Sequence, residues 1–213
     1  MSRILLAAGI VVLILAASGY LVLLPGRAET APVFLVSKAD HAEGSSKAPV
    51  TVIEYGAPTC PVCARFNAQI ITRLKRDYID GGKVRYVFRV WPRLPSDGPA
   101  EKIARCLPPG KYFAFLDLLF RNQSKWDEEF GVADPHAGLI RLARQMGLSA
   151  RTADHCSADT TQDADINKVA AEGEARYHIT GTPTIIVNDR AQPSGDLSWD
   201  RLKRLVDAAL AGK

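Results

Sequence analysis

The chain has 213 residues, of which 47% are hydrophobic and 23% are charged, which suits one domain with a sizeable core and short appendages. Its 27 basic residues are interleaved with 23 acidic ones, and the formal net charge is only +4. This pattern indicates a mixed, solvated surface and excludes the concentrated basic face that binding to nucleic acid requires.

The chain starts with an apolar run, residues 4–25, that contains no charged side chain. A membrane-spanning helix needs about 20 such residues, whereas the apolar centre of a cleaved signal peptide is usually about 7–15 residues long. We therefore expect residues 1–25 to form an uncleaved anchor in the inner membrane, with the rest of the chain facing the periplasm. The alternative is a signal sequence cleaved near Ala17-Ser18-Gly19, which would release a soluble periplasmic protein.

Residues 26–46 are polar and are predicted to form a tether, so the globular domain is expected at residues 47–213. Its first element is an apolar strand over residues 50–55, followed by a turn and by Cys60-Pro61-Val62-Cys63. Large apolar side chains then recur at every fourth position, which predicts one buried face of a helix: Phe66, Ile70, Leu74 and Tyr78.

The two cysteines fall at the start of this predicted helix. Pro61 occupies the first helical position, where its missing N–H costs nothing, and Cys60 occupies the cap. A sulfur at a helix N-terminus lies close to unpaired N–H groups and to the positive end of the helix dipole, so the pKa of Cys60 is expected to fall. Cys63 follows one turn later, close enough to form a disulfide with Cys60. The motif therefore predicts a dithiol that is oxidised and reduced in turn.

Two other interpretations of Cys60 and Cys63 are less favoured. A structural zinc site usually has a second close pair of ligands, but Cys106 and Cys156 stand alone and the four histidines have no ligand spacing. A purely structural disulfide across so short a loop would add little stability. No metal site and no bound cofactor is predicted.

The rest of the chain gives further strand and helix signals. Residues 84–90 alternate large apolar residues with arginines, as in a strand, whereas residues 93–159 contain only helical patterns. This helical insertion is longer than any connecting loop requires. A helix over residues 160–177, a strand after Pro183 and a closing helix from Trp199 complete an α/β layered domain that is interrupted once.

The order of these elements resembles the thioredoxin fold and, within it, the DsbA-like thiol:disulfide interchange proteins. The resemblance covers roughly residues 47–213. It implies an α/β thioredoxin fold with an inserted helical subdomain at about residues 93–159, preceded by an N-terminal transmembrane or signal helix. Besides the insertion, it rests on Lys47-Ala48-Pro49-Val50-Thr51, Glu54, Cys60-Pro61-Val62-Cys63 and Thr182-Pro183.

The resemblance also implies roles for the matching residues. Cys60 would be the exposed nucleophile that forms a mixed disulfide with the substrate, and Cys63 would be the buried resolving thiol. Pro183 would be a cis-proline facing the two cysteines, although only about 5–6% of X–Pro bonds in folded proteins are cis. Thr182 would offer backbone hydrogen bonds to an extended substrate.

Pro61 and Val62 are included in the predicted substrate-binding surface because they lie beside Cys60. The resemblance implies that strongly oxidising members carry a histidine at the position of Val62, where it stabilises the thiolate. Valine can neither donate a hydrogen bond nor carry a charge. We therefore expect the pKa of Cys60 to lie between about 3.5, as in DsbA, and about 8.5, as in free cysteine, and the protein to be a weaker oxidant than DsbA.

Glu54 matches a carboxylate that these proteins bury beneath the resolving cysteine. A glutamate inside an apolar strand is costly to bury as an anion, so its pKa is expected to rise. Such a group could accept and return the proton of Cys63. The alternative is an edge strand on which Glu54 points to solvent.

Cys106 and Cys156 lie in or beside the helical insertion, and we expect a structural disulfide between them. A closed loop of about 50 residues would stabilise the fold by roughly 4 kcal/mol in the chain-entropy model. The alternative, two buried free thiols, fits an exported chain less well because the periplasm permits disulfides.

Together these features predict a periplasm-facing thiol:disulfide oxidoreductase that introduces disulfides into exported proteins with free thiols. The resemblance implies that a quinone-linked, DsbB-like membrane partner reoxidises it. A reductase or isomerase kept reduced by a membrane electron donor is the nearest alternative. A metal carrier that uses Cys60 and Cys63 is less favoured, because the chain has only two methionines and no histidine cluster.

Overall fold

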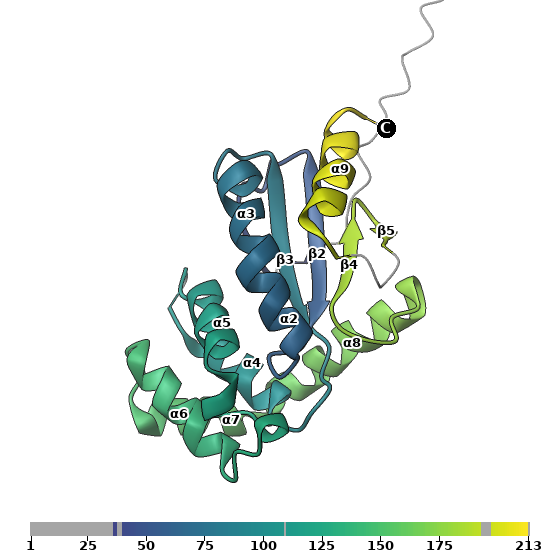
Figure 1. The fold of residues 1–213 in the computed structure, drawn as a ribbon. Coiled ribbons are helices and arrows are strands. Elements are labelled where there is room, and N and C mark those ends of the chain that lie inside the picture. Colours follow the sequence, from purple (N-terminus) through teal and green to yellow (C-terminus); the bar gives the residue numbers. More distant parts are fainter. Residues whose placement is uncertain (1–35, 38–39, 109, 193–196, 213) are drawn as a thin grey trace, which may run out of the picture. The chain divides into compact units, whose positions relative to one another are not determined.

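The computed structural model describes residues 36–37, 40–108, 110–192 and 197–212. Residues 4–25 and the cleavage site lie outside them, and no helix in the described part is long and apolar enough to cross a membrane. The described residues form one five-stranded sheet with helices on both faces and a helical subdomain at one end (Figure 1). The strand order is β1-β3-β2-β4-β5, with β1 at His41–Glu43, β2 at Val50–Gly56, β3 at Val84–Val90, β4 at Thr184–Val187 and β5 at Arg190–Ala191.

Strand β2 lies in the middle of the sheet, parallel to β3 and antiparallel to β4, and all seven of its residues are buried. Successive side chains of a strand point to opposite faces. Val50 and Val52 pack in the larger core, whereas Ile53 and Tyr55 belong to a second core on the other face. The same alternation turns Glu54 toward the larger core, which also contains both cysteines of the CxxC motif.

The predicted helix after Cys60 forms, and its apolar stripe is buried. It comprises α2 (Pro61–Phe66), η1 (Asn67–Ile71), α3 (Thr72–Leu74) and η2 (Lys75–Ile79), of which η1 and η2 are π-helical turns. A strict four-residue repeat would drift around an α-helix of 3.6 residues per turn. The wider π turns offset this drift, so the whole stripe faces the sheet and is at most 6% exposed: Phe66, Ile70, Leu74 and Tyr78.

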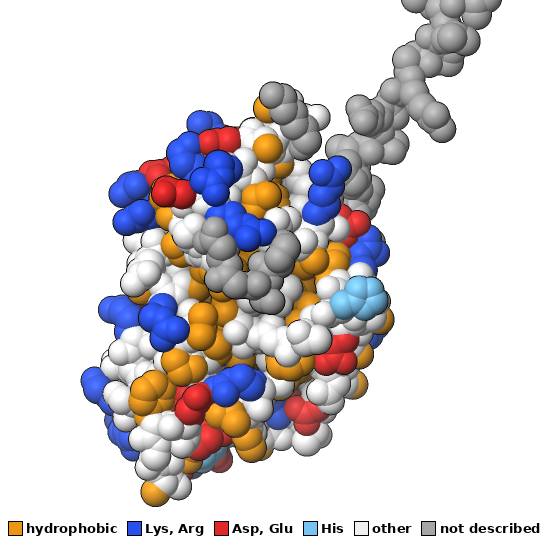
Figure 2. All heavy atoms as spheres, turned by 45° about the vertical axis from the view of Figure 1, so that its right-hand side comes forward, with side chains coloured by type: hydrophobic (Ala, Val, Ile, Leu, Met, Phe, Trp, Pro, Cys, Tyr) orange, Lys and Arg blue, Asp and Glu red, His pale blue; other side chains and the backbone are white. Residues whose placement is uncertain are grey.

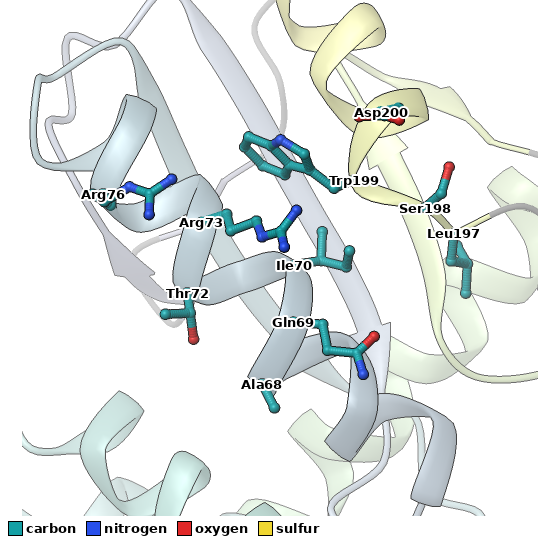
Figure 3. A pocket seen from close by; sticks show the side chains of 10 residues that line it. All are labelled: Ala68, Gln69, Ile70, Thr72, Arg73, Arg76, Leu197, Ser198, Trp199 and Asp200. Atoms are coloured by element: carbon teal, nitrogen blue, oxygen red, sulfur yellow. The ribbon is translucent and has the colours of Figure 1, made fainter.

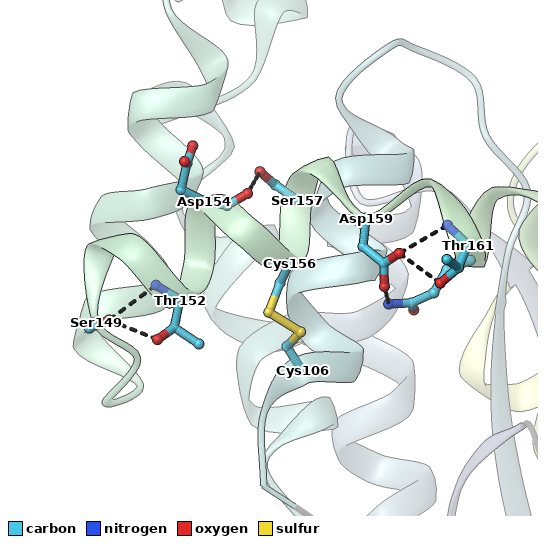
Figure 4. The surroundings of a disulfide bond; sticks show 9 residues. Cys106, Ser149, Thr152, Asp154, Cys156, Ser157, Asp159 and Thr161 are labelled. Carbon is cyan, nitrogen blue, oxygen red and sulfur yellow. Dashed lines mark hydrogen bonds between the residues drawn. A yellow bond between two sulfur atoms is a disulfide. The ribbon is translucent and has the colours of Figure 1, made fainter.

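The predicted insertion is confirmed as a helical subdomain, with one helix more than the sequence pattern indicated. The extra helix is α7 (Ala150–Ala158), which begins where Ser149 Oγ accepts a hydrogen bond from the backbone N–H of Thr152 at 3.0 Å (Figure 4). The other elements of the subdomain are α4 (Asp97–Cys106), α5 (Tyr112–Arg121), η3 (Gln123–Lys125), η4 (Glu128–Phe130) and α6 (Pro135–Gln145).

The remaining helices cover the two faces of the sheet. Helix α9 (Trp199–Leu210) buries Leu202 and Val206 in the larger core, beside the CxxC helix. On the other face lies α8 (Asp163–Tyr177), which follows the short helix η5 (Thr160–Gln162). A Cβ atom at Gly173 would lie only 2.5 Å from the ring of Tyr55, so a glycine lets α8 approach β2 closely.

Strand β1 lies inside the segment that was predicted to be a tether, so folded structure begins before Lys47. It pairs antiparallel with β3, and Asp40 just before it forms an ion pair with Arg89 at 2.8 Å. All three residues of β1 are only partly buried. A strand this short and polar leaves no periodic hydrophobic signal, which explains why the sequence did not reveal it.

The structure joins Cys106, at the end of α4, to Cys156 in α7 by a disulfide (Figure 4). The two Cα atoms are 6.2 Å apart, and 50 positions separate the cysteines in the sequence. The bond ties two helices of the insertion together, away from Cys60 and Cys63, which are free thiols in this structure.

We expect the double variant Cys106→Ala/Cys156→Ala to lose up to about 4 kcal/mol of unfolding free energy, because the unfolded chain regains the entropy of the open loop. For a domain of this size, this corresponds to a fall of roughly 10 °C in the melting temperature. Thermal unfolding followed by circular dichroism would measure it. Unchanged melting, or loss of thiol–disulfide exchange in the folded variant, would contradict a purely structural bridge.

Candidate active site

The turn after β2 places Cys60 at the N-cap of α2. Its sulfur accepts a hydrogen bond from the backbone N–H of Cys63 at 3.2 Å, and Pro61 occupies the first helical turn. The carbonyl oxygen of Cys60 accepts the N–H of Ala64 at 3.0 Å. The local arrangement expected from the sequence is therefore present.

The pKa of Cys60 falls to about 5, and the largest cause is a hydrogen bond from the Cys63 side chain. Burial opposes the shift, and the backbone N–H groups of Val62 and Cys63 add smaller contributions in the same direction as the side chain. The direction agrees with the sequence analysis, but the main cause is the second thiol rather than the helix terminus.

Cys60 is not exposed in the dithiol state, contrary to what the resemblance implied. The residue is only 3% exposed, and its sulfur lies 3.5 Å from the carbonyl oxygen of Thr182. The exposed member of the motif is Val62, at 40%. The segment before β4 thus covers the sulfur, which a sequence motif confined to residues 60–63 cannot indicate.

Cys63 has the opposite environment. It is fully buried, and burial raises its pKa well above 9.0. The hydrogen bond with Cys60 and the negative charge of Glu54 raise it further. The two sulfurs therefore differ strongly in acidity: Cys60 favours the thiolate and Cys63 favours the protonated thiol.

Glu54 is 1% exposed, and its strand is central, so the alternative of a solvent-facing edge residue was wrong. Burial raises its pKa to about 8, while a 2.6 Å hydrogen bond from the hydroxyl of Tyr86 to Oε2 opposes the rise. The other oxygen, Oε1, has no hydrogen-bond partner in the described part of the protein. Among the described residues no cation pairs with this buried carboxyl, and its partner is a hydroxyl, so it is suited to hold a proton at neutral pH.

The sequence analysis assigned no role to Tyr86, because in the alternating pattern of residues 84–90 it occupies the position of an ordinary buried strand residue. The parallel pairing of β2 with β3 places it opposite Val52, one pleat from Glu54. Its own pKa is raised well above 10.0 by burial and by Glu54, so it stays protonated and donates.

A second buried carboxylate, Asp97, holds the turn that carries Cys60. Its Oδ1 accepts the backbone N–H of Thr59 at 2.8 Å, and its Oδ2 accepts the Thr59 hydroxyl at 3.0 Å. The backbone N–H groups of Arg93 and Leu94 also donate to Oδ2, each at 2.8 Å. In the same turn, the carbonyl oxygen of Pro58 accepts the amide of Gln123 at 2.9 Å. Asp97 and Gln123 both belong to the insertion, so this subdomain fixes the approach to the nucleophile.

Asp127, also from the insertion, is a third buried carboxyl, and the charge of Cys60 is one of the causes that raise its pKa. Burial raises its pKa to about 7, together with the charges of Glu128 and Asp97. Its Oδ1 accepts the backbone N–H of Glu129 at 2.8 Å, and its Oδ2 has no hydrogen-bond partner among the described atoms. Neither Asp97 nor Asp127 gave a motif in the sequence.

The peptide bond between Thr182 and Pro183 is cis. It precedes β4, and the Thr184 hydroxyl donates to the carbonyl oxygen of Gly181 at 2.7 Å. The structure thus brings Thr182 next to Cys60, 122 positions earlier in the sequence. In the described ranges, no group of three or more His, Cys, Asp or Glu side chains is placed to hold a metal ion.

A family model described as Thioredoxin matches residues 36–208. The chain is 30% identical over 184 residues to a relative from Rickettsia typhi that is provisionally named a protein-disulfide oxidoreductase, covering 85% of this chain and 66% of the relative. It is 25% identical over 181 residues to disulfide bond formation protein D of Bacillus subtilis, covering 80% and 77%. The chain spans between 59% and 66% of the length of its Rickettsia relatives.

Solved structures show the same fold. Alpha-DsbA1 of Wolbachia pipientis superposes with a TM-score of 0.75 at 24% identity, covering 85% of this chain and 96% of that one. Oxidised BdbD of Bacillus subtilis gives a TM-score of 0.70 at 25% identity, covering 81% and 94%.

In the reduced protein, alkylation of Cys60 by iodoacetamide should rise with a midpoint near pH 5, because its thiolate is the reactive form. Cys63 should stay unreactive to above pH 9. Peptide mass mapping across a pH series would separate the two. In Cys63→Ala the midpoint of Cys60 should move upward, since the largest stabilising contact is gone. An unchanged midpoint would assign the low pKa to the helix terminus instead.

The raised pKa of Glu54 predicts a pH-dependent stability. The unfolded chain releases this proton near pH 4.5 and the folded chain near pH 8. The stabilisation is therefore complete below about pH 4.5 and is lost as the pH rises to 8, by an amount on the order of 5 kcal/mol. Urea unfolding of the wild type and of Glu54→Gln between pH 4 and 9 would measure the difference.

The same urea unfolding of the variant Tyr86→Phe tests how the tyrosine hydroxyl affects the pKa of Glu54. The tyrosine hydroxyl lowers the pKa of Glu54, so its removal should raise that pKa and extend the loss of stability beyond pH 8. If the wild type and Glu54→Gln gave parallel profiles, Glu54 would not titrate in this range.

Proposed function

This chain belongs to the thioredoxin family, and on that premise we propose that it is a DsbA-like thiol:disulfide oxidoreductase that introduces disulfides into exported proteins. The observation that carries the proposal is the unequal cysteine pair. Cys60 has a pKa of about 5, whereas Cys63 is buried with a pKa well above 9.0. Such a pair has one sulfur that leaves readily as a thiolate and one that is held as a protonated thiol.

Exchange would proceed from the oxidised Cys60–Cys63 disulfide. A substrate thiolate attacks the sulfur of Cys60, a mixed disulfide forms, and the bond to Cys63 breaks. A second substrate thiolate then attacks the substrate sulfur of the mixed disulfide and releases Cys60 as a thiolate. The substrate loses two electrons and gains a disulfide, and the protein takes both electrons as its dithiol.

Glu54 is the group that we assign to proton transfer at Cys63. The sulfur of Cys63 leaves the disulfide as a thiolate but is stable only as a thiol, so it must gain a proton. Glu54 faces the same core and, with a pKa of about 8, is protonated at neutral pH. It can give its proton to Cys63 and regain one through Tyr86 or a transient water, and the reverse transfer serves reoxidation.

The substrate-binding surface is proposed to comprise Pro61, Val62, Thr182 and Pro183. Val62 is the exposed member of the motif, and the carbonyl oxygen of Thr182 lies beside the sulfur of Cys60. An extended substrate could pair with the backbone at Thr182, as a strand adds to an exposed edge.

The low pKa of Cys60 favours the oxidase over the reductase or isomerase alternative. A stable thiolate stabilises the reduced form of the protein, and a pair whose reduced form is stabilised is a stronger oxidant. Because Val62 adds no polar contact, we place the potential between about −270 mV for thioredoxin and about −120 mV for DsbA.

We place the protein at the periplasmic side of the inner membrane, held by residues 4–25, or free in the periplasm after signal cleavage. A quinone-linked, DsbB-like membrane partner would reoxidise it. Exported proteins with free thiols are its proposed substrates.

Cys63→Ala should accumulate mixed disulfides with exported proteins, because the resolving thiol is missing while Cys60 still reacts. Cys60→Ala should not, since the pKa of Cys63 lies well above 9.0 and this sulfur stays a protonated thiol. Non-reducing gels of cells trapped with acid would reveal the adducts, and mass spectrometry would identify the linked cysteine. Equal trapping by both variants would remove the assignment of roles.

The redox state of Cys60 and Cys63 in the same acid-trapped cells shows the direction of electron flow. Wild-type protein should be found mainly as the Cys60–Cys63 disulfide after alkylation with a mass tag. A mainly reduced pair would instead indicate a reductase or isomerase. Cys106 and Cys156 should escape the tag in either case and so provide an internal control.

A further inference from the structure

Asp127 is a buried carboxyl that the proposed exchange reaction does not use. It lies between η3 and η4 of the insertion, and the residue is 0% exposed. Its Oδ1 accepts the backbone N–H of Glu129, whereas its Oδ2 has no hydrogen-bond partner among the described atoms. A carboxylate buried in this way has lost its hydration without a full set of donors in return. The neutral, protonated form is therefore the less costly one to bury.

A short chain of hydrogen bonds connects Asp127 with the turn that carries Cys60. The backbone N–H of Asp127 donates to the carbonyl oxygen of Gln123 at 2.9 Å. The side-chain amide of Gln123, which is itself buried, donates to the carbonyl oxygen of Pro58 at 2.9 Å. Pro58 stands two residues before Cys60 in the sequence. These contacts hold Asp127 on the side of the nucleophile that the insertion covers.

Among the described groups that act on Asp127, negative charges outnumber positive ones. After burial, the charges of Glu128 and Asp97 raise its pKa to about 7, and the charge of Cys60 adds to the rise. Arg93 opposes it, but this guanidinium is already engaged in an ion pair and in a 3.0 Å hydrogen bond to the turn. The proton on Asp127 is thus held in part by the charge of the nearby sulfur.

Exposed charges elsewhere on the molecule are not linked to Cys60 in this way. Figure 2 shows basic and acidic side chains next to each other on the surface, where water and salt screen them. The cavity between the CxxC helix and the start of α9 is lined by Arg73 and Arg76, and none of its described lining residues belongs to the insertion (Figure 3). Burial is what lets one charge on Cys60 shift the proton equilibrium of Asp127.

We propose that Asp127 is a positioning residue of the exchange reaction, which takes up a proton when the Cys60–Cys63 disulfide is reduced and releases it on reoxidation. The inference rests on the proposed oxidoreductase function and adds a residue to it. Asp127 acts on Cys60 through its charge, because a neutral carboxyl stabilises a neighbouring thiolate relative to an ionised one. This role is distinct from that of Glu54, which we assign to the proton of Cys63.

The balance of protons and electrons gives Asp127 its task. A substrate dithiol that becomes a disulfide gives up two electrons and two protons. The two electrons break the bond between Cys60 and Cys63; the sulfur of Cys63 binds one proton, and that of Cys60 stays a thiolate at neutral pH. When Asp127 binds the second proton, the site gains no net charge. Without that uptake, a new thiolate would face an ionised carboxylate in a buried environment.

The redox equilibrium of Asp127→Asn tests the proposal, because asparagine has nearly the same shape and cannot ionise. At pH 8.5 the ionised Asp127 of the wild type repels the Cys60 thiolate, whereas at pH 5 the carboxyl is neutral. Equilibration with glutathione should therefore favour the reduced form of the variant about fivefold more than that of the wild type at pH 8.5. This is a rise of about 20 mV in potential, and it should vanish at pH 5.

Two controls separate the charge of Asp127 from its packing. Asp154→Asn makes the same substitution at a carboxylate of α7 that is 67% exposed, so solvent screens it and the equilibrium should not change at either pH. Alkylation of Cys60 in Asp127→Asn should keep its midpoint near pH 5, because Asp127 is already protonated there in the wild type. A shifted midpoint, or an equal change of the redox equilibrium at both pH values, would indicate altered structure and overturn the proposal.

A measurement on the wild type does not depend on whether a variant folds. The side-chain carboxyl carbon of Asp127, assigned through its backbone in ¹³C-labelled protein, reports its protonation by NMR. In the dithiol form this carbon should titrate near pH 7. In the disulfide form it should titrate at a lower pH, because Cys60 then carries no charge. Titration at the same pH in both redox states would contradict the proton uptake.

The outcomes distinguish this inference from the proposed function. If reduced proteins are oxidised but Asp127 titrates alike in both redox states, the proton uptake is overturned and the oxidoreductase stands. If Asp127 titrates differently in the two states but no protein thiol is oxidised, the function fails and the coupling between Asp127 and Cys60 stands.

Discussion

The contact between the two thiols at the start of α2 is the interaction on which the chemistry depends. The N-cap geometry places the sulfur of Cys60 over the first turn, where it accepts from Cys63. Besides this contact with the backbone N–H of Cys63, a hydrogen bond between the two side chains lowers the pKa of Cys60 and raises that of Cys63, because hydrogen bonding favours the charged form of the acceptor and the neutral form of the donor. The low acidity of Cys63 requires burial as well, and the sheet and the helical subdomain supply it.

Buried carboxyl groups surround this pair, and each has a distinct physical task. Glu54 has a hydroxyl partner and no paired cation among the described side chains, so burial keeps it protonated near neutral pH. Asp97 accepts four hydrogen bonds and holds the turn before Cys60 in place. Because Asp97 comes from the insertion, the helical subdomain positions the nucleophile in addition to covering one end of the sheet.

The CxxC helix has two different faces, of which one packs against the sheet and the other is exposed to solvent. Its apolar stripe, kept in line by two π turns, packs against the sheet. On its outer side Lys75 pairs with Glu43 and Asp80, and Arg76 pairs with Asp77.

Local patterns determined much of this protein from the sequence alone. The cap at Cys60, the stripe from Phe66 to Tyr78, the strand at residues 84–90 and the helical insertion all depend on neighbours within a few residues, so periodicity and capping rules predicted them. The family resemblance implied that Glu54 and Thr182 lie near the two cysteines, whereas only the tertiary structure revealed the contacts of Tyr86 and Asp97. Tyr86 lies 32 positions from Glu54, Asp97 lies 38 from Thr59, and Thr182 covers Cys60 from 122 positions away. Contacts over such separations follow from strand register and from the docking of the insertion, which leave no repeating signal in the chain.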